Sequence, residues 1–418
     1  MEMYAKVLLI ALPSFLVLIL IEIFYGVWTK KQTYGFMDTL SSLSSGTTNL
    51  IKDVLGIGII LISYPFLKEN LAIIRIEETI LLYFGAFICV DFSSYWNHRL
   101  NHSINVFWNR HVVHHSSEEF NLACALRQSI SSLVGFGALF LLPAAILGIP
   151  HKVIVILAPL HLFGQFWYHT RHIGKLGWLE YVIVTPSQHR VHHAINPEYI
   201  DKNLSAIFCI WDRLFGTFQE ELNGVPCIYG TLKPVQTWNP FLINFQHNWG
   251  LAKDAWYTKN WFDKIKLWFM PTGWRPADVS KRFPIEKIDV NNQKKYGLNY
   301  TLKHKMIALF QFICLNAFIF LFLSSFGDLD VFSQVSFGIL IATTIFGFTS
   351  LMDGYKWAVI FEITRSLIGL CILLHPSQIM IWSINTLFAL GVTVYFAVTL
   401  TSNLWIFNTL PKRSLIVK

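Results

Sequence analysis

The sequence predicts an all-α fold, a polytopic helical membrane protein of about nine spans, on three observations. Hydrophobic residues make up 54% of the 418 residues, and aromatic residues make up 16%. Charged residues make up only 14%, whereas soluble domains carry about 25%. Apolar runs of about 20 residues, long enough to cross a bilayer as helices, recur along the chain. These observations exclude a disordered chain, a collagen and a secreted disulfide scaffold.

The candidate spans form two sets, one before and one after a long polar and aromatic stretch. They occupy residues 6–28, 50–66, 76–96, 130–149, 153–168, 306–326, 331–351, 356–374 and 378–407. Little more than Pro150 separates the fourth run from the fifth, so we expect these two runs to form a helical hairpin. The first run has no A-x-A-like cleavage site, so we expect a retained span rather than a signal peptide.

The basic residues predict the orientation in the membrane. The chain carries 33 Lys and Arg against 25 Asp and Glu residues, a net charge of +8. Such an excess is typical of cytosolic loops near anionic headgroups, and we expect no nucleic-acid partner. An N-terminus outside the membrane places the basic loops at 29–49, 97–129 and 171–305 in the cytosol, together with the tail at 411–413. The 68–75 loop fits this orientation less well.

The stretch 171–305 is too polar to span the membrane and too aromatic to be a free linker. It alternates tryptophans with basic residues: Trp256, Lys259, Trp261, Lys264, Lys266, Trp268, Trp274 and Arg275. This mixture suits the headgroup layer, where indole rings and long cationic side chains both find partners. The alternative is a packed cytosolic cap in which the tryptophans form a core.

Histidines are the most informative residues. The chain has 15 of them, and several fall into three short blocks with helical spacing. The blocks are His98 and His102; His111, His114 and His115; and His189, His192 and His193. Because residues three or four apart share one face of a helix, each block can direct two or three imidazoles at one point.

A metal centre explains these blocks better than a histidine-rich core does. Neutral imidazoles packed together leave ring nitrogens unsatisfied, and protonated imidazoles repel one another. A metal takes the lone pair of one nitrogen while the other nitrogen donates a hydrogen bond. Eight ligands exceed the three or four that one zinc ion uses, so we predict two metal ions. Imidazole alone does not choose among zinc, iron, copper and nickel.

The blocks resemble the fatty acid hydroxylase/sterol desaturase superfamily, and further motifs resemble its alkylglycerol monooxygenase branch. These motifs lie at 115–118, 121–122, 125–129, 185–187, 202–203, 211–218 and 271–276. The superfamily resemblance covers about residues 80–220, and that to the branch covers nearly the whole chain. It divides the chain into N-terminal transmembrane helices (1–75), a catalytic core (76–220), a cytosolic or interfacial aromatic and basic cap (221–305) and C-terminal transmembrane helices (306–418).

The resemblance implies that all eight block histidines bind metal. The superfamily usually has one further ligand before the last block, and His169, four residues after Gln165, matches that place. We do not expect His161 or His172 to bind metal, and we expect His172 to point to solvent. The isolated histidines are expected to be structural residues rather than metal ligands: His151, His247, His304 and His375. Two positions depart from the branch, Ser103 in place of an acidic residue and Gln188 in place of a frequent histidine.

Two aspartates are candidate catalytic residues. Asp91 lies seven residues before His98, on the same helix face, and an ionisable group within an apolar span is a functional candidate. We interpret Asp91 as orienting a ligand imidazole, with packing at a helix end as the alternative. Asp212 is interpreted in the same way, or else as an ion-pair partner of Arg213 or another basic residue. Glu118 and Arg127 are expected to hold the loop after the second block or to lie on a solvated surface, as Glu and Arg usually do.

The resemblance implies a di-iron, O2-dependent lipid hydroxylase that takes its substrate from the bilayer and cleaves ether lipids by hydroxylating the carbon beside the ether oxygen. A sterol or fatty acyl desaturase or hydroxylase on the same two Fe ions is the alternative. A metal transporter and a zinc-dependent membrane hydrolase are more remote alternatives.

No G-x-G-x-x-G follows a predicted strand, and the sequence has no P-loop, so the electrons come from outside the chain. Tetrahydrobiopterin, which the branch uses, or a separate electron-transfer protein is the expected donor. We expect the active site on the cytosolic face of the endoplasmic reticulum membrane in a eukaryote, or of the inner membrane in a bacterium.

Overall fold

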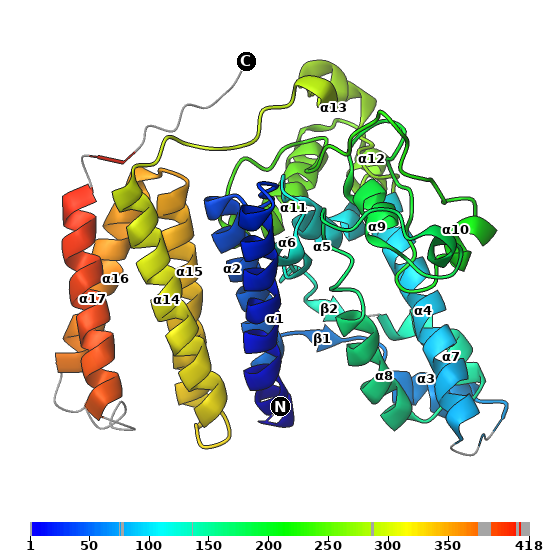
Figure 1. Ribbon diagram of the computed structural model, residues 1–418, viewed down its shortest axis with the longest axis horizontal. Helices are drawn as coiled ribbons and strands as arrows, with labels where there is room; N and C mark the ends of the chain where they lie inside the picture. The colour runs from blue at the N-terminus through cyan, green and yellow to red at the C-terminus, as the bar shows by residue number, and fades with distance from the viewer. Residues whose placement is uncertain are drawn as a thin grey trace.

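The structure is a computed structural model that describes residues 2–74, 76, 79–135, 137–285, 288–374, 386–406 and 409–410 (Figure 1). These residues are mostly helical, which confirms the predicted fold class. Within this part of the chain the strands are β1 (Ile59–Ile60) and β2 (Val134–Gly135). They pair in parallel, with Ile59 opposite Val134.

Four helices in the described part are long and apolar enough to cross a membrane, so the chain is a multi-pass membrane protein. They are α1 (Glu2–Trp28), α14 (Leu302–Ser325), α15 (Val331–Met352) and, within α17 (Thr386–Ile406), residues 389–406. Each overlaps one predicted span, although the 378–407 span begins among residues outside the described part. The predicted span at 356–374 is α16 (Lys356–Leu374), which contacts both α15 and α17.

Three other predicted spans are not continuous helices of membrane length. The 50–66 run is divided among α2 (Phe36–Val54), β1 and α3 (Tyr64–Leu71). The 130–149 run holds β2, η1 (Gly137–Leu141) and α7 (Leu142–Ile146), and the 153–168 run holds α8 (His151–Phe163). Turns divide the apolar runs where Gly56 and Gly148 adopt left-handed conformations, with φ of 64° and 67°. The predicted hairpin of two long helices is therefore wrong.

Residues 80–96 of the predicted 76–96 span lie in α4 (Ile80–Ser103), which continues beyond the span and carries the first histidine block. The Thr79 side chain caps its start by accepting a hydrogen bond from the Leu82 amide, at 3.3 Å. α4 ends at Ser103, the backbone of Ile104 is extended, and α5 (Asn105–His115) begins at the next residue. The buried Asn105 amide donates to the carbonyls of Leu267 and Trp274, so the cap segment holds this corner in place.

Figure 1 shows α14–α17 on one side of the molecule and α3, α4, α7 and α8 on the other, with α1 and α2 between them. One apolar cluster joins α2 to the first side and includes Ile51, Phe322 and Ile341. A second cluster joins α3, α4, α7 and α8 and includes Ala86 and Val153. Burial of these side chains stabilises both halves.

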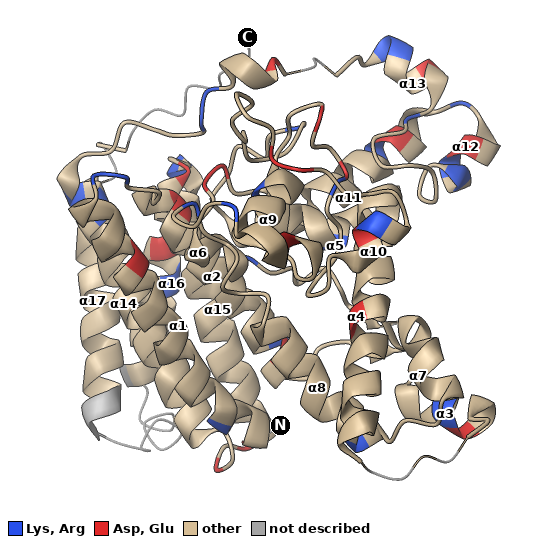
Figure 2. Ribbon diagram, turned by 45° about the vertical axis from the view of Figure 1, so that its right-hand side comes forward, with Lys and Arg blue, Asp and Glu red and all other residues tan. Residues whose placement is uncertain are grey.

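The remaining helices gather mostly at the end of the molecule opposite the start of α1 (Figure 1). They are α6 (Leu122–Ala125), η2 (Gly177–Tyr181), α9 (Pro186–His193), α10 (Ile210–Leu214), α11 (Pro240–Tyr257), α12 (Trp261–Lys266), α13 (Ala277–Arg282) and η3 (Val290–Asn292). Figure 2 shows that most Lys and Arg residues lie at this end. All three histidine blocks belong to α4, α5 and α9, which meet there.

Candidate metal centre

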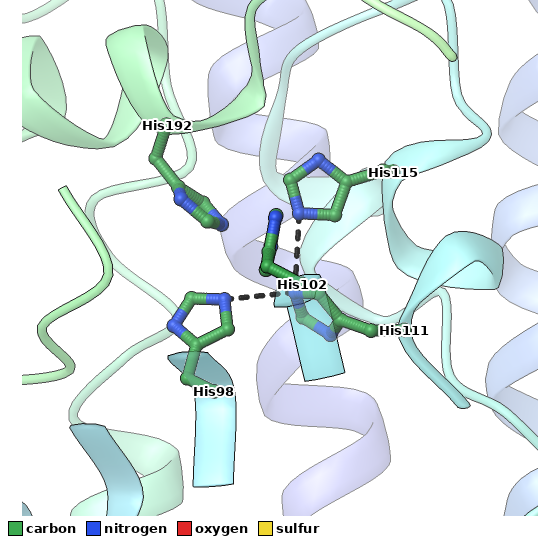
Figure 3. Close-up of side chains that lie close together, drawn as sticks. All are labelled: His98, His102, His111, His115 and His192. Atoms are coloured by element: carbon green, nitrogen blue, oxygen red, sulfur yellow. Dashed lines mark hydrogen bonds between the residues drawn. The ribbon is translucent and has the colours of Figure 1, made fainter. Parts of the chain in front are cut away.

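Nine histidines from α4, α5, α9 and the turn after α8 form two groups. The first histidine group is His98, His102, His111, His115 and His192 (Figure 3). The second histidine group is His114, His169, His189 and His193. Within each group, one ring nitrogen of every member lies within 4.8 Å of those of the others. The structure thus brings together all nine predicted ligands.

The two groups divide the second and third blocks rather than following them. On α5, His111 and His115 belong to the first group, and His114 belongs to the second. On α9, His189 and His193 belong to the second group and the intervening His192 to the first. Helix geometry explains the division, because residues at i+3 and i+4 point about 100° apart. Each of these helices therefore serves two neighbouring points, where the sequence analysis expected one point for each block.

The groups lie against each other. The rings of His115 and His193 stack with their centroids 4.3 Å apart, one from each group. Aromatic side chains enclose the two groups. The ring centroid of Phe120 lies 5.2 Å from that of His193, and the ring centroid of Trp108 lies 5.1 Å from that of His102. Phe120 is fully buried. These rings shield the imidazoles from water, a role that the sequence analysis did not assign to them.

Hydrogen bonds fix the tautomer of several imidazoles. The Nδ1 of His98 lies 2.7 Å from the Leu204 carbonyl, that of His192 lies 3.0 Å from the Lys202 carbonyl, and that of His169 lies 3.0 Å from the Gln165 carbonyl. His114 makes the same contact with the Arg127 carbonyl at 3.3 Å. A carbonyl only accepts, so Nδ1 carries the proton and donates, and Nε2 presents a lone pair to its group.

The inward-facing Nε2 atoms fit metal ions and little else. In the first group, Nε2 of His111 lies 2.8 Å from that of His98 and 3.1 Å from that of His115. In the second group, Nε2 of His169 lies 2.9 Å from that of His189. Lone pairs this close repel unless a cation or proton lies between them. The Nε2 atoms of His102 and His192 are also buried, and they have no hydrogen-bond partner within the described part of the chain.

Protonation does not relieve this crowding. Burial lowers the pKa of His114 to about 3, and it holds the pKa of His115 and of His193 well below the usual range. These three imidazoles are therefore neutral at physiological pH, which is the form that binds metal. The donor set suits two ions of zinc, iron, copper or nickel.

A four-residue loop orients three members of the first group. Asp201 Oδ1 lies 3.0 Å from the Nδ1 of His102, and the loop also contains the Lys202 and Leu204 carbonyls. Asp201 and Asn203 both adopt left-handed conformations, with φ of 55° and 52°. The Asn203 side chain secures the loop by donating to the carbonyls of Gln188 and Gln219. Sequence reasoning missed Asp201, because no local pattern connects it with a histidine 99 residues away.

Asp212 stabilises this loop through hydrogen bonds to its backbone. Its carboxylate accepts hydrogen bonds from the amides of Leu204, at 2.7 Å, and Ser205, at 3.0 Å. It also accepts one from the Thr217 hydroxyl at 2.7 Å. Asp212 was expected to orient an imidazole, and it reaches His98 indirectly, through the Leu204 backbone. Arg213, the alternative partner, instead donates to the Glu180 carbonyl.

Asp91 is fully buried and binds an imidazole, but that imidazole belongs to His161, outside both groups. The distance from its Oδ1 to His161 Nε2 is 2.7 Å. Its carboxylate also accepts from the amides of Ile207 and Phe208 and from the Trp211 indole. Asp91 was expected to orient a ligand imidazole, and the imidazole that it contacts directly is that of His161, which belongs to neither group.

The loop after the second block is held by a buried ion pair. Arg127 Nη2 lies 2.9 Å from Asp38 Oδ1 on α2, and its Nη1 lies 2.9 Å from Ser116 Oγ. Glu118 accepts hydrogen bonds from the Tyr296 amide and the Gln293 side chain. Arg127 is 1% exposed, so of the two predicted roles the structure favours loop anchoring over surface solvation.

The other predicted positions lie away from the two groups. His172 is half-buried against the Tyr25 ring, and its Nε2 is enclosed, so the expectation that it points to solvent is wrong. His247 Nε2 donates a hydrogen bond to the Asn105 carbonyl, and His304 caps α14. His375 lies outside the described residues. Gln188 donates to the Glu180 carbonyl, and the Ser103 hydroxyl donates to the Arg99 carbonyl.

Comparison with known proteins adds an independent observation. The family model for fatty acid hydroxylase matches residues 83–217, which contain both histidine groups. An alkylglycerol monooxygenase of Homo sapiens is 33% identical over 366 residues, covering 86% of this chain and 81% of the relative. One of Xenopus tropicalis is 37% identical over 282 residues, covering 67% of this chain and 62% of the relative. No solved structure matches the chain.

Proposed function

This chain belongs to the alkylglycerol monooxygenase family and is a membrane-bound lipid hydroxylase, and we propose that it cleaves glycerol ether lipids at a di-iron centre held by the two histidine groups. The observation that carries the proposal is the division of nine imidazoles into two adjoining sets of Nε2 lone pairs. The sets offer five and four imidazoles, enough to hold one ion each, and the family relationship favours iron among the metals that imidazole suits.

The reaction balances with O2 as the oxidant. Hydroxylation at the carbon beside the ether oxygen consumes one O2, two electrons and two protons, and it yields a hemiacetal and water. The hemiacetal C–O bond then breaks to give an aldehyde and a free glycerol hydroxyl. Two bound iron ions would supply the reduction of O2 and the oxidation of the C–H bond.

The chain's own residues would hold the metal ions, orient their ligands and exclude water from the site. The nine imidazoles would hold the metal, and backbone carbonyls keep their Nε2 lone pairs directed inward. Asp201 and Asp212 stabilise the orientation of the first group, directly and through the Leu204 backbone. Phe120 and Trp108 enclose the imidazoles, which limits side reactions with water. No protein acid or base is needed for the hemiacetal to collapse.

A small reductant is the proposed electron donor, with tetrahydrobiopterin as the first candidate and a separate electron-transfer protein as the alternative. A cavity of about 250 Å³ lies against the loop after the second block. Its lining includes Ser116, Glu118, Arg127, Trp238 and Tyr296, and Ser116 directly follows His115. An aromatic and polar cavity so close to the first group favours a small heterocyclic donor over a protein.

We propose that the end of the molecule with the two histidine groups faces the cytosol, at the endoplasmic reticulum in a eukaryote or the inner membrane in a bacterium. The concentration of Lys and Arg at this end supports that orientation (Figure 2). The cap at 221–305 would lie in the headgroup layer, because Trp256 is 81% exposed and Trp261 is 80% exposed. Lys264 lies 5.4 Å above the Trp261 ring, a pairing that suits that layer.

The test is an assay of purified protein in lipid nanodiscs with an alkylglycerol, a sterol and a fatty acyl lipid as separate substrates. We expect aldehyde release from the alkylglycerol alone, dependent on O2 and reductant, with one atom of ¹⁸O₂ in the aldehyde or its hemiacetal precursor when exchange with water is prevented by immediate reduction. Comparison of tetrahydrobiopterin with a reduced electron-transfer protein identifies the donor. Oxidation of the sterol or acyl lipid instead would contradict the ether-lipid assignment, and activity without O2 would contradict the oxygenase.

A further inference from the structure

A buried chain of hydrogen bonds connects Asp91 with the second histidine group. Asp91 Oδ1 lies 2.7 Å from His161 Nε2, and His161 Nδ1 lies 3.1 Å from the Gln165 side-chain nitrogen. The main-chain carbonyl of the same Gln165 lies 3.0 Å from the Nδ1 of His169, so the covalent frame of Gln165 joins the two bonds. Asp91, His161 and His169 are all at least nine-tenths buried. The chain runs from α4 through the end of α8 to a member of the second group.

Each bond in this chain has one consistent direction. Asp91 accepts from the Nε2–H of His161, which leaves a lone pair on His161 Nδ1. The Gln165 amide nitrogen only donates, so it bonds that lone pair, and it also lies 3.3 Å from the His161 carbonyl. His169 donates from Nδ1 to the Gln165 carbonyl, which directs its Nε2 lone pair toward His114 and His189. Every donor in the series therefore faces an acceptor.

His169 needs such support because of where it lies. It is the member of the second group outside α5 and α9, and it follows the end of α8 by six residues in a series of turns. The backbone bond that it makes is from its amide to the Phe166 carbonyl, at 3.3 Å. A turn of this kind leaves the direction of an imidazole poorly determined unless side chains fix it. Phe120 stacks on the His169 ring with the centroids 5.8 Å apart, and the hydrogen bond that sets the rotation of the ring runs to Gln165, whose side chain His161 holds.

We propose that His161, held by Asp91, is a positioning residue that fixes Gln165 and thereby aims His169 at the metal of the second group. This inference rests on the proposed function. This series of hydrogen bonds does not act as a proton wire, because Gln165, which links the two imidazoles, does not titrate. Asp91 and His161 thus contribute to metal affinity without touching the metal.

The experiment compares His161→Phe with His161→Gln in the full chain in nanodiscs. Phe removes both ring nitrogens while keeping a planar ring beside Phe87, which lies 5.4 Å from His161. Gln keeps a donor for Asp91 and an acceptor for Gln165. The matched control is His304→Phe, since His304 is also buried but lies on α14 away from both groups. Asp91 is left unchanged because its further bonds to Ile207, Phe208 and Trp211 make loss of folding the expected result.

The readouts are the affinity of each site for Co²⁺, followed by its visible absorption bands, and the unfolding temperature of the metal-free protein. For His161→Phe we expect one of the two sites to weaken 10–100-fold, the other to keep its affinity, and the bands of the weakened site to shift. His161→Gln should restore most of the affinity. The control should match the wild type in both sites.

A His161→Phe protein that binds both Co²⁺ ions as the wild type does would overturn the positioning role while leaving the proposed function intact. Equal loss in His161→Phe and His161→Gln would also overturn it, and so would weakening of both sites in step with a lowered unfolding temperature. Failure of the proposed function appears earlier, in the wild type, as fewer than two sites or no oxidation of an ether lipid.

Discussion

His111 and His114 lie three residues apart on α5, yet their imidazoles belong to different histidine groups. His111 Nε2 faces that of His98 at 2.8 Å, and His114 Nε2 faces that of His169 at 3.3 Å. His189 and His192 divide in the same way on α9. Two short helices therefore hold two metal positions between them, and the rings of His115 and His193 stack where the positions adjoin.

Substitution within one block should distinguish the two positions. His111→Ala removes a donor of the first group and His114→Ala removes one of the second, so each should weaken a different site. We expect the wild type to bind two Co²⁺ ions. In each variant the affinity of one site for Co²⁺ should fall by at least the 10–100-fold typical of changes around a ligand. The two variants should also differ in their visible spectra. Identical spectra for both would contradict the assignment to separate groups.

His169 and His172 provide a second comparison. His169→Ala should weaken the second group and abolish turnover, because its Nε2 lies 2.9 Å from that of His189. His172→Ala should retain both metal ions, because His172 packs against Tyr25 away from the groups. Metal analysis and turnover on the same preparations make the comparison. Loss of metal from both variants would mean that the turn after α8 is held differently.

Asp201 should matter for metal binding although it is largely exposed. Asp201→Gly removes the acceptor for His102 Nδ1 but suits the left-handed backbone at φ 55°, so the fold should tolerate it. We expect a 10–100-fold loss of affinity in the first group. Asp201→Asn keeps an oxygen acceptor and should lose much less. Equal affinities in the Gly variant and the wild type would show that this hydrogen bond does not orient His102.

The Arg127–Asp38 ion pair should contribute to folding rather than to metal choice. Arg127→Leu leaves Asp38 without its 2.9 Å partner and should lower stability by about 3–5 kcal/mol, as breakage of a buried pair typically does. The double variant Arg127→Leu/Asp38→Leu should recover part of that loss. Thermal unfolding of the metal-free protein measures it. A single variant as stable as the wild type would contradict a structural role for the pair.

The sequence predicts the fold class and the eight block histidines well, because composition and helical spacing are local properties, whereas His169 followed from the family resemblance alone. It predicts helix continuity poorly at 50–66 and 130–149, because apolar residues are equally suited to long spans and to short helices separated by turns. The division of each block between two groups depends on how α4, α5 and α9 meet. The bond of Asp201 to His102 and that of Asp91 to His161 join residues 99 and 70 apart in the chain, which spacing alone does not reveal.

The central claim is that two iron ions bind, one in each histidine group. Anaerobic titration of the purified, metal-free chain with Fe²⁺, followed by removal of free metal and measurement of iron per chain, tests it most directly. We predict a plateau at two iron ions per chain, falling to one in both His111→Ala and His114→Ala. A wild-type plateau at one ion, at full occupancy, would contradict the claim.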